Sequence, residues 1–302
     1  MSQIQVDLDQ VRYEFMVRIA ERIVEAGGTI FGGFLRDKLI RDHYSKMKAA
    51  EVEKTKVAEI EKTEKVEKTI PQNLNLVFDG DADELQRFYQ GITRDDVDFT
   101  SEIDNRPHPF LQQGFRHSVE LTMKNAEQIV GKPISLHLDL FCSPRPVDFL
   151  AGDQDLQCNQ LICDTEGIRA SADPAVDGSV FRKFSHEQEL IARILARTTR
   201  VVPSPEGTLR CRLQSAVKMM LRGWTVENIN SFRVVEPCVG LCLFCQDQIQ
   251  GRSIELNCCM RPAHSDCFLR FLEEPDRCFF SKTSCRHQIC LEILQPRDDM
   301  PA

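Results

Sequence analysis

Hydrophobic positions recur with two periods over the first 235 residues of the chain, and each period predicts one kind of element. Apolar side chains three or four residues apart predict amphipathic helices, the first with Asp9 as its N-cap and Gly27-Gly28 as its end. Short apolar or alternating runs predict strands. The predicted helices span residues 9–26, 34–43, 83–90, 120–130, 186–197 and 209–222, and the predicted strands span 29–31, 74–78, 97–100 and 134–141.

Because these helices and strands alternate, residues 1–235 are expected to form an α+β domain with a mixed sheet and flanking helices. A Lys/Glu-rich stretch at about 44–70 interrupts the alternation and predicts a solvated helical insertion, which Pro71 ends. After Pro237 the composition changes, and a second, smaller domain is expected over residues 238–295.

The composition of the chain is that of a globular protein long enough for two domains: 302 residues, of which 42% are hydrophobic and 28% are charged. A net charge of −8 argues against a uniformly basic nucleic-acid coat protein. The N-terminal segment lacks the pattern of a secretory signal, and no apolar run is as long as a membrane span. The chain is therefore expected to be intracellular, with reduced thiols, away from membranes, and in either the cytoplasm or the nucleus.

Cysteine is concentrated in the second domain, where nine of the 13 cysteines lie between Cys238 and Cys290. Thiolate and imidazole are the usual ligands of tetrahedral Zn²⁺, and pairs two residues apart bring two ligands to one side of a turn. A segment this short also has too small a core to fold without help, which metal binding supplies. The candidate ligands are Cys242, Cys245, Cys258, Cys259, His264, Cys267, Cys278, Cys285, His287 and Cys290.

Carboxylates and glycines form a second candidate site in the first domain. Gly32-Gly33 lies between a predicted strand and a predicted helix, where the backbone can approach a phosphate. Asp96 and Asp98 are two residues apart at a predicted strand, and Asp139 is a charge within an apolar strand. Three such carboxylates would make an oxygen-rich Mg²⁺ site. The rival pair in Asp79-Gly80-Asp81 is equally well explained as a turn.

These residues together resemble the nucleotidyltransferase superfamily, in particular the heads of tRNA CCA-adding enzymes and bacterial-type poly(A) polymerases, over roughly residues 10–225. That family carries a Gly-Gly turn, an Arg-Asp pair, an Asp-x-Asp at the start of a strand and a third Asp. The stretch 155–161 is similar to the family's Asp-Phe-Thr-x-Asn-Ala-Leu segment, although the two arginines that normally precede it are absent. The matching residues are Gly32, Gly33, Arg36, Asp37, Asp96, Asp98 and Asp139.

The resemblance implies an activity. Gly32, Gly33, Arg36 and Asp37 would bind a nucleoside triphosphate, while the three aspartates would hold catalytic Mg²⁺ for transfer of a nucleotide to a hydroxyl such as an RNA 3′ end. A basic segment that includes Arg210, Arg212, Lys218 and Arg222 either follows the RNA phosphates or is the solvated face of a helix.

The cysteine-rich domain resembles a RING finger, which binds two structural zinc ions in a cross-brace. By this resemblance the first zinc is held by Cys242, Cys245, His264 and Cys267. The second is held by Cys258 or Cys259 (or both) with Cys278 and Cys285, and is completed by His287 or Cys290.

Many RING domains bind a ubiquitin-conjugating enzyme through an apolar surface, for which Leu243, Phe244 and Phe268 are candidates if they are not core residues. Two alternatives therefore stand beside nucleotide transfer. One is a RING-type ubiquitin ligase whose first domain recognises a target. The other is a catalytically silent scaffold that retains both folds.

Overall fold

The structure is a computed structural model that describes residues 7–54, 73–80, 82–104, 115–142, 154–171, 180–202, 209–257 and 259–271. The chain divides into two compact units. The first comprises residues 1–153 and 159–191, and the second comprises 154–158 and 192–302. The helix predicted at 209–222 therefore belongs to the same unit as the clustered cysteines, and the boundary expected near Pro237 falls within strand β10 (Phe232–Leu241).

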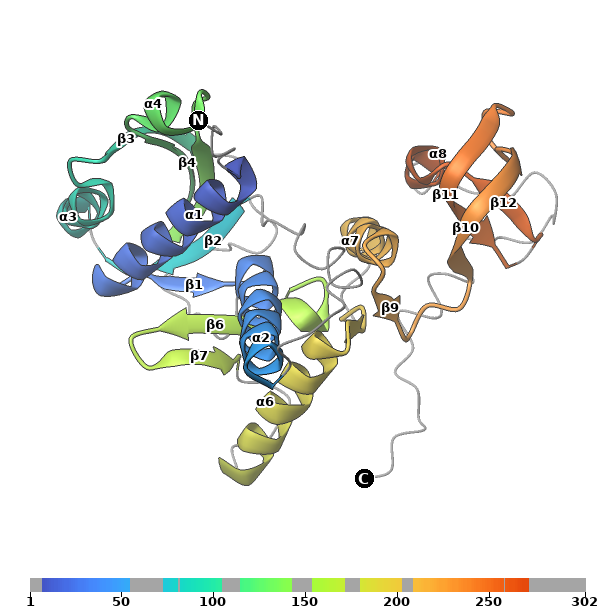
Figure 1. Ribbon diagram of the computed structural model, residues 1–302, viewed down its shortest axis with the longest axis horizontal. Coiled ribbons are helices and arrows are strands. Elements are labelled where there is room, and N and C mark those ends of the chain that lie inside the picture. The colour runs from blue at the N-terminus through green and yellow to red at the C-terminus, as the bar shows by residue number, and fades with distance from the viewer. Residues whose placement is uncertain are drawn as a thin grey trace. The chain divides into compact units, whose positions relative to one another are not determined.

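A seven-stranded mixed sheet is the framework of the first unit (Figure 1). Its strands lie in the order β3-β4-β5-β2-β1-β6-β7. Neighbours are antiparallel except β2 and β5, which run parallel. The strands are β1 (Thr29–Phe31), β2 (Asn73–Phe78), β3 (Val97–Asp104), β4 (Phe115–Met123), β5 (Ser135–Cys142), β6 (Leu161–Asp164) and β7 (Gly167–Ala170). The predicted combination of a mixed sheet with helices is thus confirmed for this unit.

Helices pack on this sheet through apolar faces. Phe15, Met16, Ile19 and Ile23 of α1 are all at most 1% exposed, and α1 packs against β1 and α3. Gly28 allows the close approach, because a Cβ there would lie 2.9 Å from side-chain carbons of Ile23 and Phe88. The described helices of this unit are α1 (Leu8–Glu25), α2 (Gly33–Lys54), α3 (Ala82–Thr93), α4 (Ala126–Val130) and α6 (Val180–Leu195), the last of which extends into the second unit.

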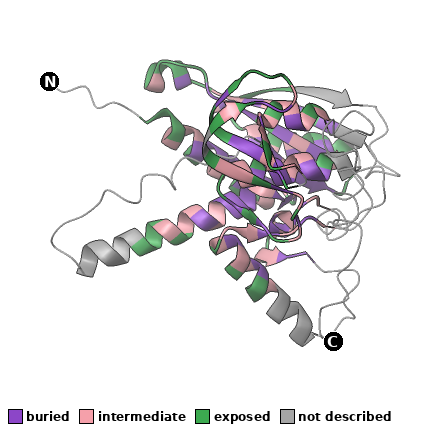
Figure 2. Cartoon of the chain, turned by 90° about the vertical axis from the view of Figure 1, so that its right-hand side faces the viewer, coloured by how far each residue is buried: buried purple, intermediate pink, exposed green. Residues whose placement is uncertain are grey.

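Two predictions, for α1 and α2, need correction. Asp7, not Asp9, caps α1, because its carboxylate accepts hydrogen bonds from the N–H groups of Asp9 and Gln10. The helix expected to end at residue 43 continues as α2 to Lys54, into the Lys/Glu-rich insertion. Figure 2 shows burial falling along this helix, from its first turns at the sheet to an exposed later part. The rest of the insertion, residues 55–72, lies outside the described residues.

The helix predicted at 120–130 is wrong over its first half. Its first part belongs to β4, whose side chains at Val119 and Leu121 are fully buried while Glu120 between them is only partly buried. This alternation has the period of a strand, and pairing with both β3 and β5 stabilises it. Only the short helix α4 remains, and it starts after Asn125 adopts a left-handed backbone with φ of 61°.

The second unit contains helix α7 (Leu209–Leu221), a three-stranded antiparallel sheet and a short helix α8 (Ser265–Phe271). The sheet has the order β10-β11-β12, with β11 at Gln248–Leu256 and β12 at Arg261–Ala263. Ile254, Leu256 and Phe268 form its small core, and the Phe232 ring lies 4.9 Å from that of Phe268. Three short elements complete the unit: β8 (Thr198–Thr199), β9 (Thr225–Val226) and most of the 3₁₀ turn at Gln157–Asn159.

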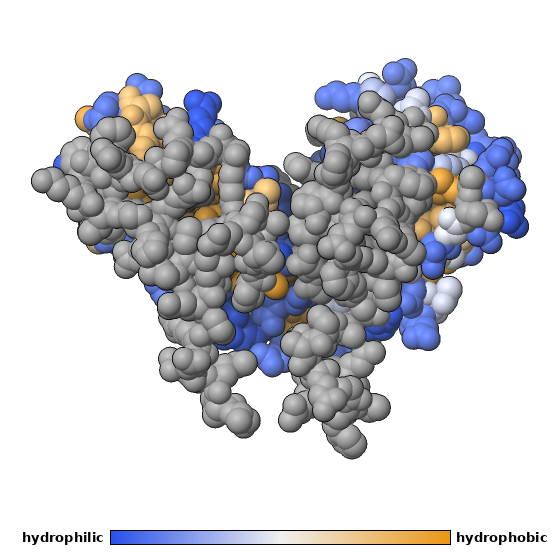
Figure 3. All heavy atoms as spheres, turned by 180° about the vertical axis from the view of Figure 1, so that it is seen from behind, coloured by the Kyte–Doolittle hydropathy of each residue, from blue (hydrophilic) through white to orange (hydrophobic). Residues whose placement is uncertain are grey.

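Few large apolar side chains are exposed in the described ranges. The face shown in Figure 3 is mostly hydrophilic wherever it is coloured, with small apolar areas between. None of the described helices is both long enough and apolar enough to cross a membrane. The exposed large apolar residues are Leu8, Met47, Phe99, Ile129, Val239, Leu241 and Met260.

Candidate functional site

Four side chains in the second unit converge as a zinc-ligand set. Cys242 and Cys245 lie in the tight loop between β10 and β11, where Gln246 has the positive φ of 64° that the turn requires. His264 follows β12, and Cys267 lies in the first turn of α8. The sheet thus brings a C-x₂-C pair and an H-x₂-C pair, separate in sequence, to one point.

The distances within this cluster suit a tetrahedral Zn²⁺ ion. The Sγ atoms of Cys245 and Cys267 lie 3.4 Å and 3.9 Å from His264 Nδ1, and all four ligand atoms lie within 4.8 Å of one another. With Zn–S near 2.3 Å and Zn–N near 2.0 Å, two ligands of a tetrahedral site are about 3.5–3.8 Å apart. Cys242, Cys245, His264 and Cys267 could therefore hold one zinc ion, as the sequence predicts.

The thiols of the cluster differ in acidity. Burial raises the pKa of Cys242, but hydrogen bonds from the backbone N–H groups of Cys245, His264 and Phe244 outweigh burial and lower the pKa to about 6. For Cys267, burial and the neighbouring thiols of Cys245 and Cys242 act in the same direction and raise the pKa to about 12. Cys242 is thus the thiol that ionises first, and a bound Zn²⁺ would favour deprotonation of the others.

Of the three apolar residues that are candidates for a docking surface beside the cluster, two are buried. Leu243 is 5% exposed and Phe268 is fully buried, so both belong to the small core. Phe244 is half-buried and stacks on Phe271 with ring centroids 4.9 Å apart. Of the three candidates for an exposed apolar surface, only Phe244 is open to solvent.

The proposed ligands of a second zinc are mostly outside the described residues. Cys259 is described and half-buried. Cys258, Cys278, Cys285, His287 and Cys290 lie outside the described ranges. In the described part of the chain, no further group of three metal-ligating side chains comes as close together as the first set.

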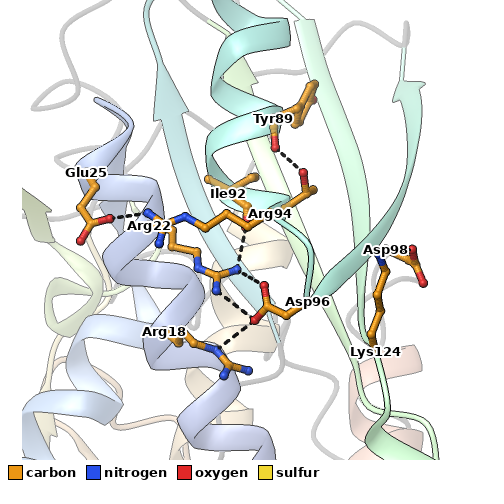
Figure 4. Close-up of polar contacts among 10 residues, drawn as sticks. Arg18, Arg22, Glu25, Tyr89, Ile92, Arg94, Asp96, Asp98 and Lys124 are labelled. Atoms are coloured by element: carbon orange, nitrogen blue, oxygen red, sulfur yellow. Dashed lines mark hydrogen bonds and ion pairs between the residues drawn. The ribbon is translucent and has the colours of Figure 1, made fainter.

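The three aspartates predicted to bind Mg²⁺ do not come together. Asp98 on β3 pairs with Thr122 on β4, which pairs with Ser135 on β5. Asp139 lies four residues further along β5, which places it about 13 Å along the strand from that point and two strands across. Asp96 precedes β3, so it does not share a strand face with Asp98. Figure 4 shows Asp96 pointing toward α1 and Asp98 pointing away from it, toward Lys124.

Asp96 is engaged by arginines of α1. Its two carboxylate oxygens accept hydrogen bonds of 2.7 Å and 2.9 Å from the guanidinium of Arg22, and Arg18 lies 3.8 Å away. Arg22 is only 10% exposed and also donates to the carbonyl of Ile92. The hydrogen bonds from Arg22 lower the pKa of Asp96. This carboxylate joins α1 to the start of β3, a role that accounts for its charge.

Replacement of Asp96 by Asn is expected to lower the free energy of unfolding by about 1 kcal/mol, because Arg22 would lose a bidentate ion pair whose carboxylate is 40% exposed. Since the folded-state pKa of Asp96 is lowered, this stabilisation is present at neutral pH and is lost as the pH falls through the acidic range. Asp98, 71% exposed with Lys124 at 3.4 Å, offers the matched variant Asp98→Asn, expected to change stability by less than about 0.5 kcal/mol. Urea unfolding followed by circular dichroism at several pH values measures both, and equal effects would contradict this role.

The glycine turn and the Arg-Asp pair lie together, as the sequence predicts. Gly32 has a φ of 87°, and its N–H donates to the carbonyl of Leu161 on β6. Arg36 and Asp37 are buried at the start of α2. Arg36 donates to Asp37 at 2.6 Å and to the side-chain oxygen of Asn159 at 2.8 Å. The turn and the start of α2 are therefore joined by hydrogen bonds to Leu161 and Asn159, at the end of the 155–161 segment.

Arg212 of the predicted basic helix is a structural residue. It is 1% exposed, and its guanidinium donates to the carbonyls of Gln154 and Val202. Lys218 and Arg222, in contrast, are exposed. A phosphate backbone could reach the latter two but not Arg212, and the side chain of Arg210 is outside the described set.

Sequence reasoning missed two residues beside Asp139. Asn73 and Asn75 open β2, and Asn75 is the register partner of Asp139 on the adjacent strand β5. The sequence does contain a signal for them. Asn73-x-Asn75 begins the first strand after the helix that follows Gly32-Gly33, and its two-residue spacing is the same as that of Asp96 and Asp98.

Comparison of the chain with models of protein families gives no match. Comparison with curated proteins likewise gives no match. The arrangement of the residues themselves is therefore the basis for any statement about function.

Proposed function

We propose that the protein is a zinc-dependent scaffold, in which a zinc-folded module of the second unit docks a partner protein and the first unit is a nucleotidyltransferase-like fold without catalysis. The observation that carries this proposal is the convergence of Cys242, Cys245, His264 and Cys267 from a loop, a strand end and a helix start. A metal at this point would tie together all the elements of a module with a small core.

The absence of catalysis in the first unit is supported by the positions of its carboxylates. Metal-dependent transfer requires acidic side chains around shared ions. Asp96 is instead bound by Arg22, while Asp98 and Asp139 lie on strands that β4 separates. Two hydrogen bonds support the likeness to the nucleotidyltransferase fold, one from Gly32 to Leu161 and one from Arg36 to Asn159. Both join the Gly-Gly and Arg-Asp motif to the 155–161 segment, and the resemblance includes both of these motifs.

Ubiquitin ligation is the second candidate function, and one observation favours it. The described cluster takes its ligands from the first and the third pair along the chain and leaves out Cys259 between them. This alternation is the ligand order of a RING cross-brace, in which the intervening pair serves the second zinc. A second zinc held by Cys258 or Cys259 with Cys278 and Cys285 accordingly remains part of the proposal.

Two assays on the full-length, zinc-loaded protein test this function. Incubation with RNA, Mg²⁺ and each labelled nucleoside triphosphate is expected to give no incorporation. Incorporation that Asp98→Asn abolishes would overturn the scaffold proposal in favour of nucleotide transfer. Incubation with ubiquitin, its activating enzyme and a panel of conjugating enzymes decides between the two docking functions. Ubiquitin chains that disappear in Phe244→Ala but persist in Val239→Ala would assign the ligase function.

A further inference from the structure

The end of the sheet beside the Gly-Gly turn brings together three polar side chains. Strand β1 pairs Phe31 with Asn75, so Gly32, which follows Phe31, lies beside the opening residues of β2. On the other side of β2, the parallel strand β5 pairs Asp139 with Asn75. The turn, both asparagines and the aspartate are therefore neighbours on adjacent strands.

The side chains of this group lie on one face and contact one another. Asn73 and Asn75 are two residues apart on a strand, a spacing that directs both side chains to the same side. The amide nitrogen of Asn73 donates to a carboxylate oxygen of Asp139 at 2.8 Å and lies 3.4 Å from the amide oxygen of Asn75. Asn73 is exposed, and the other two are half-buried, so the group is open to solvent at its edge.

The charge of this group does not suit a divalent cation. Mg²⁺ in proteins is bound through carboxylate oxygens together with waters and substrate phosphates. The family that the first unit resembles supplies three carboxylates at this position, an Asp-x-Asp and a third Asp. This group carries one carboxylate and two neutral amides, and one amide directs an N–H donor at that carboxylate. The residues present therefore do not fit the metal that the nucleotidyltransferase resemblance implies.

We infer that Asn73, Asn75 and Asp139 mark the cation-binding position of this fold, and that the two amides keep the position free of divalent metal. Asp96 and Asp98 are then outside it. This inference rests on the proposed function, because it takes the first unit to be a nucleotidyltransferase-like fold that is catalytically silent. It goes beyond that function by naming Asn73 and Asn75 as the residues that make the unit catalytically silent. It also predicts that carboxylates in place of these two amides create a metal site.

The test is the variant Asn73→Asp/Asn75→Asp in the full chain loaded with zinc. Electron paramagnetic resonance of free Mn²⁺ counts bound ions during a titration. We expect the double variant to gain one site whose Kd is at least ten-fold lower than that of any Mn²⁺ site in the wild-type protein. Addition of Asp139→Asn should abolish this site, whereas addition of Asp98→Asn, the matched control on the same sheet, should leave it intact.

Repulsion among three carboxylates could unfold the metal-free variant, so its melting temperature is measured with and without Mn²⁺. A melting temperature that rises with Mn²⁺ in the double variant but not with Asp139→Asn supports the inference. A folded variant that binds no more Mn²⁺ than the wild-type protein would overturn it, as would an unfolded variant that Mn²⁺ does not restore. Nucleotide incorporation by the wild-type protein would contradict the proposed function instead, so the two failures are distinguishable.

Discussion

Removal of zinc is expected to unfold the segment from β10 to α8 while the seven-stranded sheet of the first unit stays folded. In the described residues, the three-stranded sheet and α8 bury a small set of large apolar side chains: Phe232, Ile249, Ile254, Leu256 and Phe268. In small zinc domains, metal binding contributes about 10–16 kcal/mol of apparent free energy, more than such a core supplies. This is the largest effect that the structure predicts for any single change.

Hydrogen–deuterium exchange of the full-length protein, with and without a high-affinity zinc chelator, measures this effect. Protection should disappear in peptides that cover β11 and α8 and return when zinc is added back. Cys245→Ser should reproduce the loss, whereas Cys211→Ser, which replaces an exposed cysteine on α7 outside the cluster, should not. Undiminished protection of β11 and α8 in the chelated protein would mean that this module folds without metal.

Replacement of Arg212 by Ala is expected to lower the free energy of unfolding of the second unit by about 3 kcal/mol. The side chain is 1% exposed, and its guanidinium donates to the carbonyls of Gln154 at 3.0 Å and Val202 at 2.9 Å. Its loss removes charge-assisted hydrogen bonds to the carbonyls of two half-buried residues and leaves a cavity where the buried side chain was. The effect is large because this one residue joins α7 to two separate chain segments.

The single tryptophan of the protein makes this measurement specific. Trp224 lies just after α7 and is 7% exposed, so its fluorescence should report unfolding of the second unit. Lys218→Ala, an exposed basic residue on the same helix, is the matched control and should shift the urea midpoint little, with a change below about 0.5 kcal/mol. If both variants had equally small effects, Arg212 would not be a structural residue. It would then belong to a solvated basic face of α7, one of the two alternatives that the sequence allows.

Local patterns were sufficient for part of this fold, whereas β4, β6, β7 and the three-stranded sheet of the second unit were not predicted. The helix at 209–222 and the strands at 29–31, 74–78 and 134–141 are found within one or two residues, because apolar spacing and flanking breakers determine them locally. The segment at 120–130 shows where this fails. Val119 and Leu121 fit an irregular helix as well as a strand, and only pairing with β3 and β5 decides between them.

The two candidate sites differ in the same way. The candidate zinc ligands were predicted from ligand type and from the two-residue spacing within each pair, which are local features of the sequence. Their assignment to one ion came from the resemblance to a RING finger. Whether the aspartates meet at one site depends on which strands are neighbours and on the register in which they pair. The sequence does not show that β2 rather than β3 lies beside β5, so Asn75 rather than Asp98 faces Asp139. Nor does it show that Arg22, seventy-four positions away, pairs with Asp96.

X-ray absorption at the zinc edge of the full-length protein tests most directly the claim that Cys242, Cys245, His264 and Cys267 hold a zinc ion. The ligand swap His264→Cys keeps four ligands, and hence the fold, while it replaces one nitrogen by sulfur. We predict that the wild-type spectrum contains Zn–S distances near 2.3 Å together with a nitrogen shell near 2.0 Å and imidazole scattering, and that this imidazole scattering falls in the variant. A zinc-free wild-type protein, or a spectrum that His264→Cys leaves unchanged, would contradict the account.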